Sequence, residues 1–284
     1  MNEEENNQQL INNADDLEIK IDKKTISLKI KIAIIIIISV IILSIVATVI
    51  ILILKNDEQS DGSSNSDILP IIIEPTSEYT HCIIWLHGLD NYPENFVDLF
   101  GKEVPFLKKS NTKIILLRAP YQNMTYNNKS LTSWFDILTW PIDDPDSYNF
   151  TDAIKSRKVV EKVINEEAKK LNGQYNKIFI GGHSQGACIS LYTAYNFEEL
   201  LGGVLVCSGI LFPQGEIVGD KIKLNVFLGH GTGDKAIPLS FHNETIKRIE
   251  NFEGVRKYYY QGKGHDVHTL EKADMSGFLN ETMI

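Results

Sequence analysis

The sequence predicts an α/β protein whose mainly parallel sheet carries helices on both faces, preceded by one transmembrane helix near the N-terminus. Three observations lead to this prediction: short apolar runs alternate with helical patterns, several runs end in glycine-rich turns, and one uncharged run is far longer than a strand. Strands that alternate with helices generally pair in parallel, with both sheet faces covered. Of the 284 residues, 43% are hydrophobic, which is enough for a substantial core.

The N-terminal part divides into a polar tail and an apolar segment. Asn, Gln, Asp and Glu dominate the start of residues 1–31, and such a segment buries too little apolar surface to offset the entropy of ordering. Residues 32–54 contain no charged side chain and consist mostly of Ile, Val and Leu. As a helix they would extend about 34 Å, enough to cross a hydrocarbon core of ~30 Å. We expect a disordered tail at 1–31 and a transmembrane helix at 32–54.

The flanking charges predict how this helix is oriented. Five lysines precede it within residues 20–31, whereas Lys55 alone follows closely. Positive charge is retained in the cytosol, so we expect a cytosolic N-terminus and a lumenal or extracellular C-terminal part. The alternatives are a buried core segment or a cleaved signal peptide, but the apolar region of a signal peptide is usually ~7–15 residues long and lies close to the N-terminus. Five Asn-x-Ser/Thr sequons agree with the lumenal orientation, at Asn123, Asn128, Asn149, Asn243 and Asn280.

After a polar linker at residues 55–67, residues 68–284 are expected to form one α/β domain. Helical patterns occur at 147–171 and 187–195, and Gly173 suits the C-terminal cap of the first. Pro238 is predicted to open a further helix that ends near Phe252. Six apolar runs predict strands, at 82–86, 113–117, 177–180, 203–207, 224–228 and 255–260.

A Gly-x-Ser-x-Gly sequence occupies residues 182–186, between a predicted strand and a predicted helix. In that context the pattern is typical of a nucleophile elbow, because its glycines permit the tight turn that presents the hydroxyl of Ser184. The alternative is an ordinary glycine-rich turn. We predict a nucleophilic serine and, with it, the α/β-hydrolase fold.

A serine nucleophile needs a base, and the base needs a carboxylate that fixes its tautomer. In this fold the chain order is Ser, then Asp or Glu, then His. Asp234 follows one predicted strand and His265 follows the next, each after a glycine-rich turn. Since open α/β sheets place their sites at the carboxyl ends of strands, we predict that Ser184, Asp234 and His265 form a catalytic triad.

Other side chains compete for these roles. His268 and Asp266 neighbour His265, and His230 precedes Asp234, where we interpret it as structural. His265 and His268 resemble a metal-binding pair, but no third ligand cluster accompanies them. We therefore expect no metal and no cofactor.

Composition limits the remaining classes of function. The formal net charge of -9 argues against nucleic-acid binding, which needs clustered positive charge. Cys82, Cys188 and Cys207 lie in apolar runs, and an odd number of cysteines cannot all pair. We expect all three to be buried thiols.

Oxyanion stabilisation requires two preorganised N–H donors, one after the nucleophile and one after an early strand. The backbone N–H groups of Gln185 and Leu89 are the candidates. Several motifs, taken in order, then resemble the acyl-protein thioesterase, lysophospholipase and carboxylesterase family of small α/β hydrolases. They are WLHGL (85–89), LRAP (117–120), SWFD (133–136), GHSQG (182–186), HGTGD (230–234) and GKGH (262–265).

The resemblance covers residues 80–275 and implies the triad and oxyanion donors already named. It also implies that residues 120–134 cover the substrate, with Leu89 and Trp134 among the substrate-binding residues. The chain departs from the family's pattern at Asp90, which follows Leu89 directly where the family usually has Gly. Familiar members are soluble cytosolic proteins, so the apparent membrane anchor is a second departure.

We therefore predict a serine hydrolase that cleaves carboxylic esters or thioesters through an acyl-enzyme. Lysophospholipids, small lipophilic esters and S-acyl thioesters, including those of S-acylated proteins, are the expected substrates. Two alternatives stay open: an inactive binding ectodomain that keeps the hydrolase fold, because fold alone does not fix function, and a peptidase on the same fold.

Overall fold

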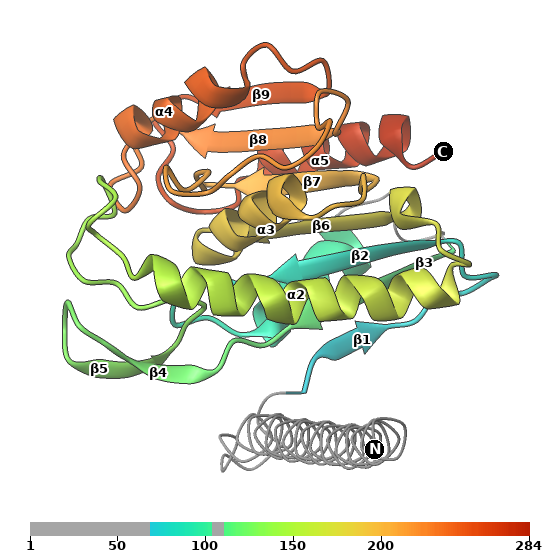
Figure 1. Cartoon of the computed structure of the whole chain (residues 1–284), viewed down its shortest axis with the longest axis horizontal. Helices are drawn as coiled ribbons and strands as arrows, with labels where there is room; N and C mark the ends of the chain where they lie inside the picture. The colour runs from blue at the N-terminus through green and yellow to red at the C-terminus, as the bar shows by residue number, and fades with distance from the viewer. Residues whose placement is uncertain (1–68, 104–110) are drawn as a thin grey trace, which may run out of the picture. The chain divides into compact units, whose positions relative to one another are not determined.

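The computed structural model describes residues 69–103 and 111–284, which contain a seven-stranded sheet and a separate hairpin (Figure 1). The sheet order is β1-β3-β2-β6-β7-β8-β9, and all neighbours are parallel except β1, which runs antiparallel to β3. The strands are β1 (Ile71–Ile73), β2 (His81–Leu86), β3 (Thr112–Leu117), β6 (Ile178–His183), β7 (Gly203–Cys207), β8 (Val226–Gly231) and β9 (Val255–Tyr260). The mainly parallel sheet predicted from the sequence is confirmed.

Helices cover both faces of the sheet, as predicted. The helices are α2 (Phe150–Lys170), α3 (Gln185–Asn196), α4 (Leu239–Ile249) and α5 (Thr269–Thr282). One face packs against α2, α3 and α4, and the other against α5 and two short helical turns, η1 (Pro93–Phe96) and η2 (Leu99–Glu103). Figure 1 shows α2 and α3 in front of the sheet and α5 behind it. The central strands β2 and β7 are buried along their whole length, which is why they read as continuous apolar runs.

Strand and helix boundaries differ slightly from the predicted ones. The helix expected at 147–171 begins at Phe150, because the Asn149 side chain accepts a hydrogen bond from the Thr151 N–H at 3.0 Å and caps it. At its other end, Asn172 adopts the left-handed conformation (φ 54°), and the Gly173 N–H donates to the Ala168 carbonyl. The helix ends at Lys170 and Leu171 is its C-cap, so Gly173 lies two positions beyond the cap.

Besides the short turns η1 and η2, four further features were not predicted. They are β1, α5, the 3-10 turn η4 (Tyr175–Lys177), and the hairpin of β4 (Tyr121–Met124) and β5 (Lys129–Thr132). The hairpin occupies the stretch that resembles a substrate-covering loop. The Pro238 helix is present, but Pro238 precedes its first residue and the helix ends at Ile249 rather than near Phe252.

Within the two described ranges, no helix combines the length and apolar character needed to span a bilayer. The predicted tail (1–31), transmembrane helix (32–54) and linker (55–67) lie outside those ranges. All three cysteines are buried and free, as expected.

Candidate active site

The nucleophile elbow (residues 182–186) joins the end of β6 to the start of α3. Ser184 has φ 55° and ψ -121°, a conformation that is costly for a residue other than glycine. Its N–H donates to the Cys207 carbonyl at 2.9 Å, which ties the turn to β7. The strained turn leaves the hydroxyl at the carboxyl edge of the sheet, with the residue 8% exposed.

Both glycines of the elbow are required by close backbone contacts. A Cβ atom on Gly182 would lie 2.5 Å from the Leu86 carbonyl oxygen, and one on Gly186 would lie 2.2 Å from the same atom. The elbow therefore packs directly on the end of β2, with no space for a methyl group.

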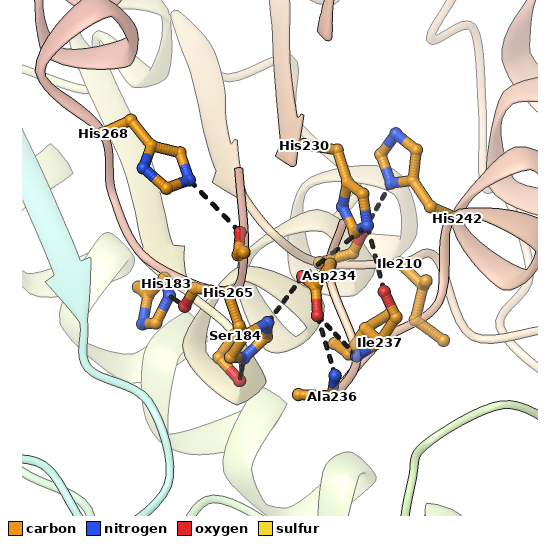
Figure 2. A network of polar contacts seen from close by, with 12 residues as sticks. His183, Ser184, Ile210, His230, Asp234, Ala236, Ile237, His242, His265 and His268 are labelled. Atoms are coloured by element: carbon orange, nitrogen blue, oxygen red, sulfur yellow. Dashed lines mark hydrogen bonds and ion pairs between the residues drawn. The ribbon is translucent and has the colours of Figure 1, made fainter. Parts of the chain in front are cut away.

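Ser184, His265 and Asp234 form one hydrogen-bonded chain (Figure 2). His265 Nε2 lies 2.7 Å from Ser184 Oγ, and His265 Nδ1 lies 2.6 Å from Asp234 Oδ2. The three residues come from the turns after β6, β8 and β9, which meet at one edge of the sheet. The structure thus brings together all three side chains that the sequence pointed to.

The Asp234 carboxylate is held on both of its oxygens. Its Oδ1 accepts the N–H groups of Ala236 at 2.8 Å and Ile237 at 3.0 Å, while Oδ2 faces His265. Burial alone would raise the pKa of Asp234, but the hydrogen bonds from His265 and from Ile237 hold that pKa below its ordinary value. Asp234 is therefore ionised and available to fix the His265 tautomer.

The remaining histidines near the site have other partners. His230 Nε2 lies 3.0 Å from the Ile237 carbonyl and 3.7 Å from Asp234 Oδ2, and its ring stacks on His242 with centroids 4.1 Å apart. Burial and the neighbouring His242 lower the pKa of His230 to about 3, so this ring is neutral. His268 Nε2 lies 3.2 Å from the Gly264 carbonyl and takes no part in the hydrogen bonds of Ser184.

His183, inside the elbow, was not singled out by sequence reasoning. Its Nε2 lies 2.8 Å from the main-chain oxygen of His265, so it links the elbow to the segment that carries His265. Burial and the nearby His265 lower the pKa of His183 to about 4. A neutral ring with a hydrogen on Nε2 donates this bond.

The loop that carries Leu89 is fixed by the buried His87. Its Nε2 accepts the Ala119 N–H at 3.0 Å, so the hydrogen sits on Nδ1, which donates to the Gly88 carbonyl at 2.7 Å. Burial lowers the pKa of His87 to about 4, which keeps this neutral tautomer. Nothing in the LHGL motif alone distinguishes this supporting role of His87 from a catalytic one.

Trp134 bonds to the segment that precedes Leu89, and the Gln185 side chain bonds in turn to Ser133 and Trp134. Trp134 is 2% exposed, and its indole Nε1 donates to the His87 carbonyl at 2.7 Å. The Gln185 amide oxygen accepts from Ser133 Oγ at 2.9 Å and from the Trp134 N–H at 3.1 Å. Trp134 thus lies beneath the Leu89 loop rather than on the surface, although its neighbour Leu89 is partly exposed.

The two expected oxyanion donors belong to segments next to Ser184: Gln185 follows it in the chain, and a Cβ atom on Gly88, which precedes Leu89, would lie 3.2 Å from the Ser184 Cβ. Gln185 is the first residue of α3, so its N–H has no acceptor inside the helix. Leu89 precedes Asp90, which has φ 53° and donates its N–H to the Thr132 carbonyl at 2.9 Å. A left-handed residue at this place explains why glycine suits it and why aspartate, which tolerates that conformation better than most residues, replaces it.

No group of three or more His, Cys, Asp or Glu side chains in the described ranges is arranged to hold a metal ion. His265 and His268, the pair considered from the sequence, have separate hydrogen-bond partners.

The chain is similar to known proteins in sequence and in fold. Residues 69–283 match the family model described as Phospholipase/Carboxylesterase. Acyl-protein thioesterase 1 of Candida albicans is 30% identical over 210 residues, covering 69% of this chain and 90% of that protein. Acyl-protein thioesterase 1 of Saccharomyces cerevisiae is 28% identical, covering 71% of this chain and 92% of that protein.

Solved structures show the same fold at lower identity. Zea mays acyl-protein thioesterase 2 has a TM-score of 0.63 at 19% identity and covers 76% of this chain and 99% of its own. A Bacillus cereus carboxylesterase has a TM-score of 0.63 at 18% identity and covers 77% of this chain and 96% of its own. These structures establish the α/β-hydrolase fold of the described residues.

Proposed function

The chain belongs to the phospholipase/carboxylesterase family, and from that premise we propose that Ser184, His265 and Asp234 cleave acyl esters or thioesters through an acyl-enzyme. An ester or thioester hydrolase is what the family and its thioesterase relatives support. The observation that carries the residue assignment is the continuous chain from Ser184 Oγ through His265 to Asp234, with links of 2.7 and 2.6 Å.

In the proposed mechanism, Ser184 Oγ attacks the acyl carbonyl carbon while His265 Nε2 takes its proton. The proton then passes from His265 to the leaving alcohol or thiol, and the acyl group stays on Ser184. Water attacks the acyl-enzyme with His265 again as base, which releases the acid and restores the serine. Asp234 stabilises the imidazolium formed in each step.

The N–H groups of Leu89 and Gln185 are the proposed donors to the oxyanion. Their support comes from the packing beneath them: His87 fixes the loop of Leu89, and the start of α3 fixes Gln185. Such donors stabilise charge that develops in the transition state, because they need no reorganisation when the reaction occurs.

The substrate class is proposed from the relatives and from the membrane segment together. The curated relatives are named acyl-protein thioesterases, which supports S-acyl thioesters. A transmembrane helix at 32–54 would hold the site close to lipid, which supports lysophospholipids and lipophilic esters as well. Leu89 is a proposed substrate contact. Trp134 is buried, and its proposed effect on substrate binding is indirect, through its hydrogen bond to His87 in the loop of Leu89.

We also propose that the catalytic domain, residues 68–284, faces a lumen or the exterior. The lysines before the span support this orientation. Four of the five sequon asparagines are exposed, at Asn123, Asn128, Asn243 and Asn280, whereas Asn149 caps α2 and is partly buried. Glycosidase sensitivity after eukaryotic expression, with protease protection of sealed vesicles, tests it: no shift and a digestible domain would reverse the orientation.

A substrate panel tests the proposed activity. The full-length chain, purified in detergent, is assayed with a lysophospholipid, short and long aryl esters, and an S-acyl peptide, each beside Ser184→Ala. Turnover of at least one class, abolished by the substitution, supports the hydrolase. Failure on every class, together with no labelling by a serine-directed phosphonate, would favour the inactive binding domain, and amide cleavage would favour the peptidase.

A further inference from the structure

Glu271 is a buried carboxyl group that the mechanism above does not use. It lies in the first turn of α5, six residues after His265, and is 1% exposed. No cationic side chain pairs with it in the described ranges. Burial raises the pKa of Glu271 to about 7. A buried carboxyl without a countercharge is costly and calls for an explanation.

The contacts of Glu271 reach the His265 loop (residues 262–268) and the strands β8 and β7. Its Oε2 accepts the His268 N–H at 3.2 Å, in the His265 loop. Its Oε1 packs on β8 so closely that a Cβ atom on Gly229 would lie 2.1 Å away. On β7, burial and the neighbouring Glu271 carboxyl raise the pKa of Cys207, whose carbonyl accepts the Ser184 N–H.

His268 bonds both to Glu271 and to the start of its own loop. The His268 ring bonds to the Gly264 carbonyl at 3.2 Å, and the His268 N–H bonds to Glu271. His265 lies between Gly264 and His268, so a shift of His268 moves the main chain on one side of the base directly. The His265 side chain is also more solvent-accessible than that of Asp234, with 23% exposed against 0%.

The bond to the His268 N–H is one half of a capping box at the start of α5, with His268 as the N-cap and Glu271 three positions on, so it also stabilises the helix. The capping bond uses only one carboxyl oxygen. The other, Oε1, is buried and has no N–H or O–H partner among the described residues; the neighbouring Cys207 thiol is a weak donor to the carboxyl. Apolar residues surround the site on α5, including Met275 and Phe278, and a methionine would fill the same space. Capping alone does not require the second oxygen to be buried against β8, so the arrangement also fixes where the capped segment lies on the sheet.

We propose that Glu271 is a positioning residue that holds the His265 loop against β7 and β8, so that His265 stays in line with Ser184 and Asp234. The inference rests on the proposed function, because it concerns where the catalytic base is placed. Glu271 acts through the His268 N–H and the loop; it touches neither substrate nor the reacting atoms.

The test compares Glu271→Met with Glu271→Gln in the full-length chain, using a substrate that the wild-type protein turns over. Glu271→Met keeps the side-chain volume and removes the acceptor of the His268 N–H. We expect kcat to fall about 10- to 100-fold with KM within about 3-fold, because a displaced base slows chemistry more than binding. Glu271→Gln keeps an oxygen acceptor, and we expect it to restore kcat to within about 3-fold of wild type.

Asp274→Ala is the matched control on the same helix. Asp274 Oδ2 accepts the Tyr260 hydroxyl at 3.0 Å, and among the described residues no hydrogen bond joins Asp274 to the His265 loop; the centroids of the Tyr260 and His268 rings lie 6.1 Å apart. Its loss should lower the melting temperature while kcat stays at the wild-type value. If Asp274→Ala lowered kcat as much as Glu271→Met, general loosening of α5 would explain both, and the positioning role would be wrong.

A second pair of variants removes the same hydrogen bond from the donor side, in case Glu271→Met does not fold. His268 has φ -81°, which proline can adopt, so His268→Pro deletes the N–H and His268→Ala deletes only the ring. We expect His268→Pro to have a lower kcat than His268→Ala. Equal kcat values for this pair, or a folded Glu271→Met with wild-type kcat, would overturn the proposal.

The proposed function and this inference fail in distinguishable ways. If the wild-type chain is inactive and unlabelled by a phosphonate, the proposed function is wrong. If wild-type is active and Ser184→Ala is not, while Glu271→Met keeps full kcat, the function stands and only the positioning role of Glu271 is excluded.

Discussion

The nucleophile elbow and the His265 loop both end in the triad, but different forces hold them. Close backbone contacts fix the elbow: its two glycines lie against the Leu86 carbonyl, and α3 packs across β6 and β7. The His265 loop has one close backbone contact of this kind, between Gly231 and the carbonyl oxygens of Lys263 and Gly264. Its later part, which carries His265, is held by hydrogen bonds from His183, His268 and Glu271. A contact that excludes a methyl group is all-or-none, whereas a hydrogen bond contributes only about 1 kcal/mol.

The first prediction concerns the triad, where the two regions meet. His265→Ala or Asp234→Asn should lower kcat by about 10⁴-fold or more, and the double variant should be little worse than either single one, because the triad acts as a unit. Steady-state kinetics on the purified variants measures this. His268→Ala serves as the comparison, and if it were the more damaging change, His265 would not be the base.

The second prediction concerns the elbow. Gly186→Ala places a methyl group 2.2 Å from the Leu86 carbonyl oxygen, so β2 or α3 must move. We expect a loss of about 3 kcal/mol in the free energy of unfolding, with activity lost as well, because Ser184 moves with the turn. Urea unfolding measures the loss. Gly277→Ala is the control, since an added Cβ there meets nothing within 4 Å; equal stabilities would show that the elbow tolerates displacement.

The sequence predicted the elbow better than the His265 loop for the same physical reason. The tight turn requires glycine at Gly182 and Gly186 around Ser184, and this short sequence pattern can be recognised without knowing the fold. The supporting bonds of Glu271 and His183 join segments distant along the chain, and no local pattern reports them. Asp234 and His265 could be named because each follows a strand, yet their distances depend on the sheet order.

Elements outside the site show the same limit. The predicted strands of the parallel sheet agree with the observed ones to within three residues at each end, because burial makes them continuous apolar runs. The strand β1 has only three residues, and the β4–β5 hairpin is largely exposed, so neither has a distinctive pattern. The sequence of α5 mixes charged and apolar residues with little amphipathic order, so the helix could not be recognised from its pattern.

The third prediction is that the stability contributed by Glu271, next to the His265 loop, depends on pH, whereas that of the elbow does not. Its pKa rises from an ordinary value of 4.5 to about 7, so the folded state binds this proton more tightly than the unfolded state. The Glu271 contribution to stability is therefore fully present below about pH 4.5, falls as pH rises toward 7, and stays lost above it.

Glu271→Gln should abolish this contribution to the pH slope, so its stability relative to wild type should increase between pH 4.5 and 7. Urea unfolding across that range tests the expectation. Gly186→Ala acts on the elbow and should leave the slope unchanged. A parallel pH dependence in wild type and Glu271→Gln would mean that Glu271 is ionised in the folded protein throughout.

The fourth and smallest effect is expected at His183, which bridges the regions. His183→Phe keeps a planar ring but loses the 2.8 Å bond to the His265 main-chain oxygen. One neutral hydrogen bond of about 1 kcal/mol corresponds to a decrease of about 5-fold in kcat. His183→Gln retains a donor and should recover part of that loss; a Phe variant with unchanged kcat would show that the remaining bonds hold the loop alone.

The central claim, that Ser184 carries the acyl group during turnover, is tested most directly by trapping it. The full-length chain is mixed with an activated long-chain ester or a serine-directed phosphonate, quenched in acid, digested and mapped by mass spectrometry. We predict one adduct, on Ser184, with no adduct in Ser184→Ala and a strongly slowed reaction in His265→Ala. An adduct on another residue, or turnover by Ser184→Ala near the wild-type rate, would contradict the account.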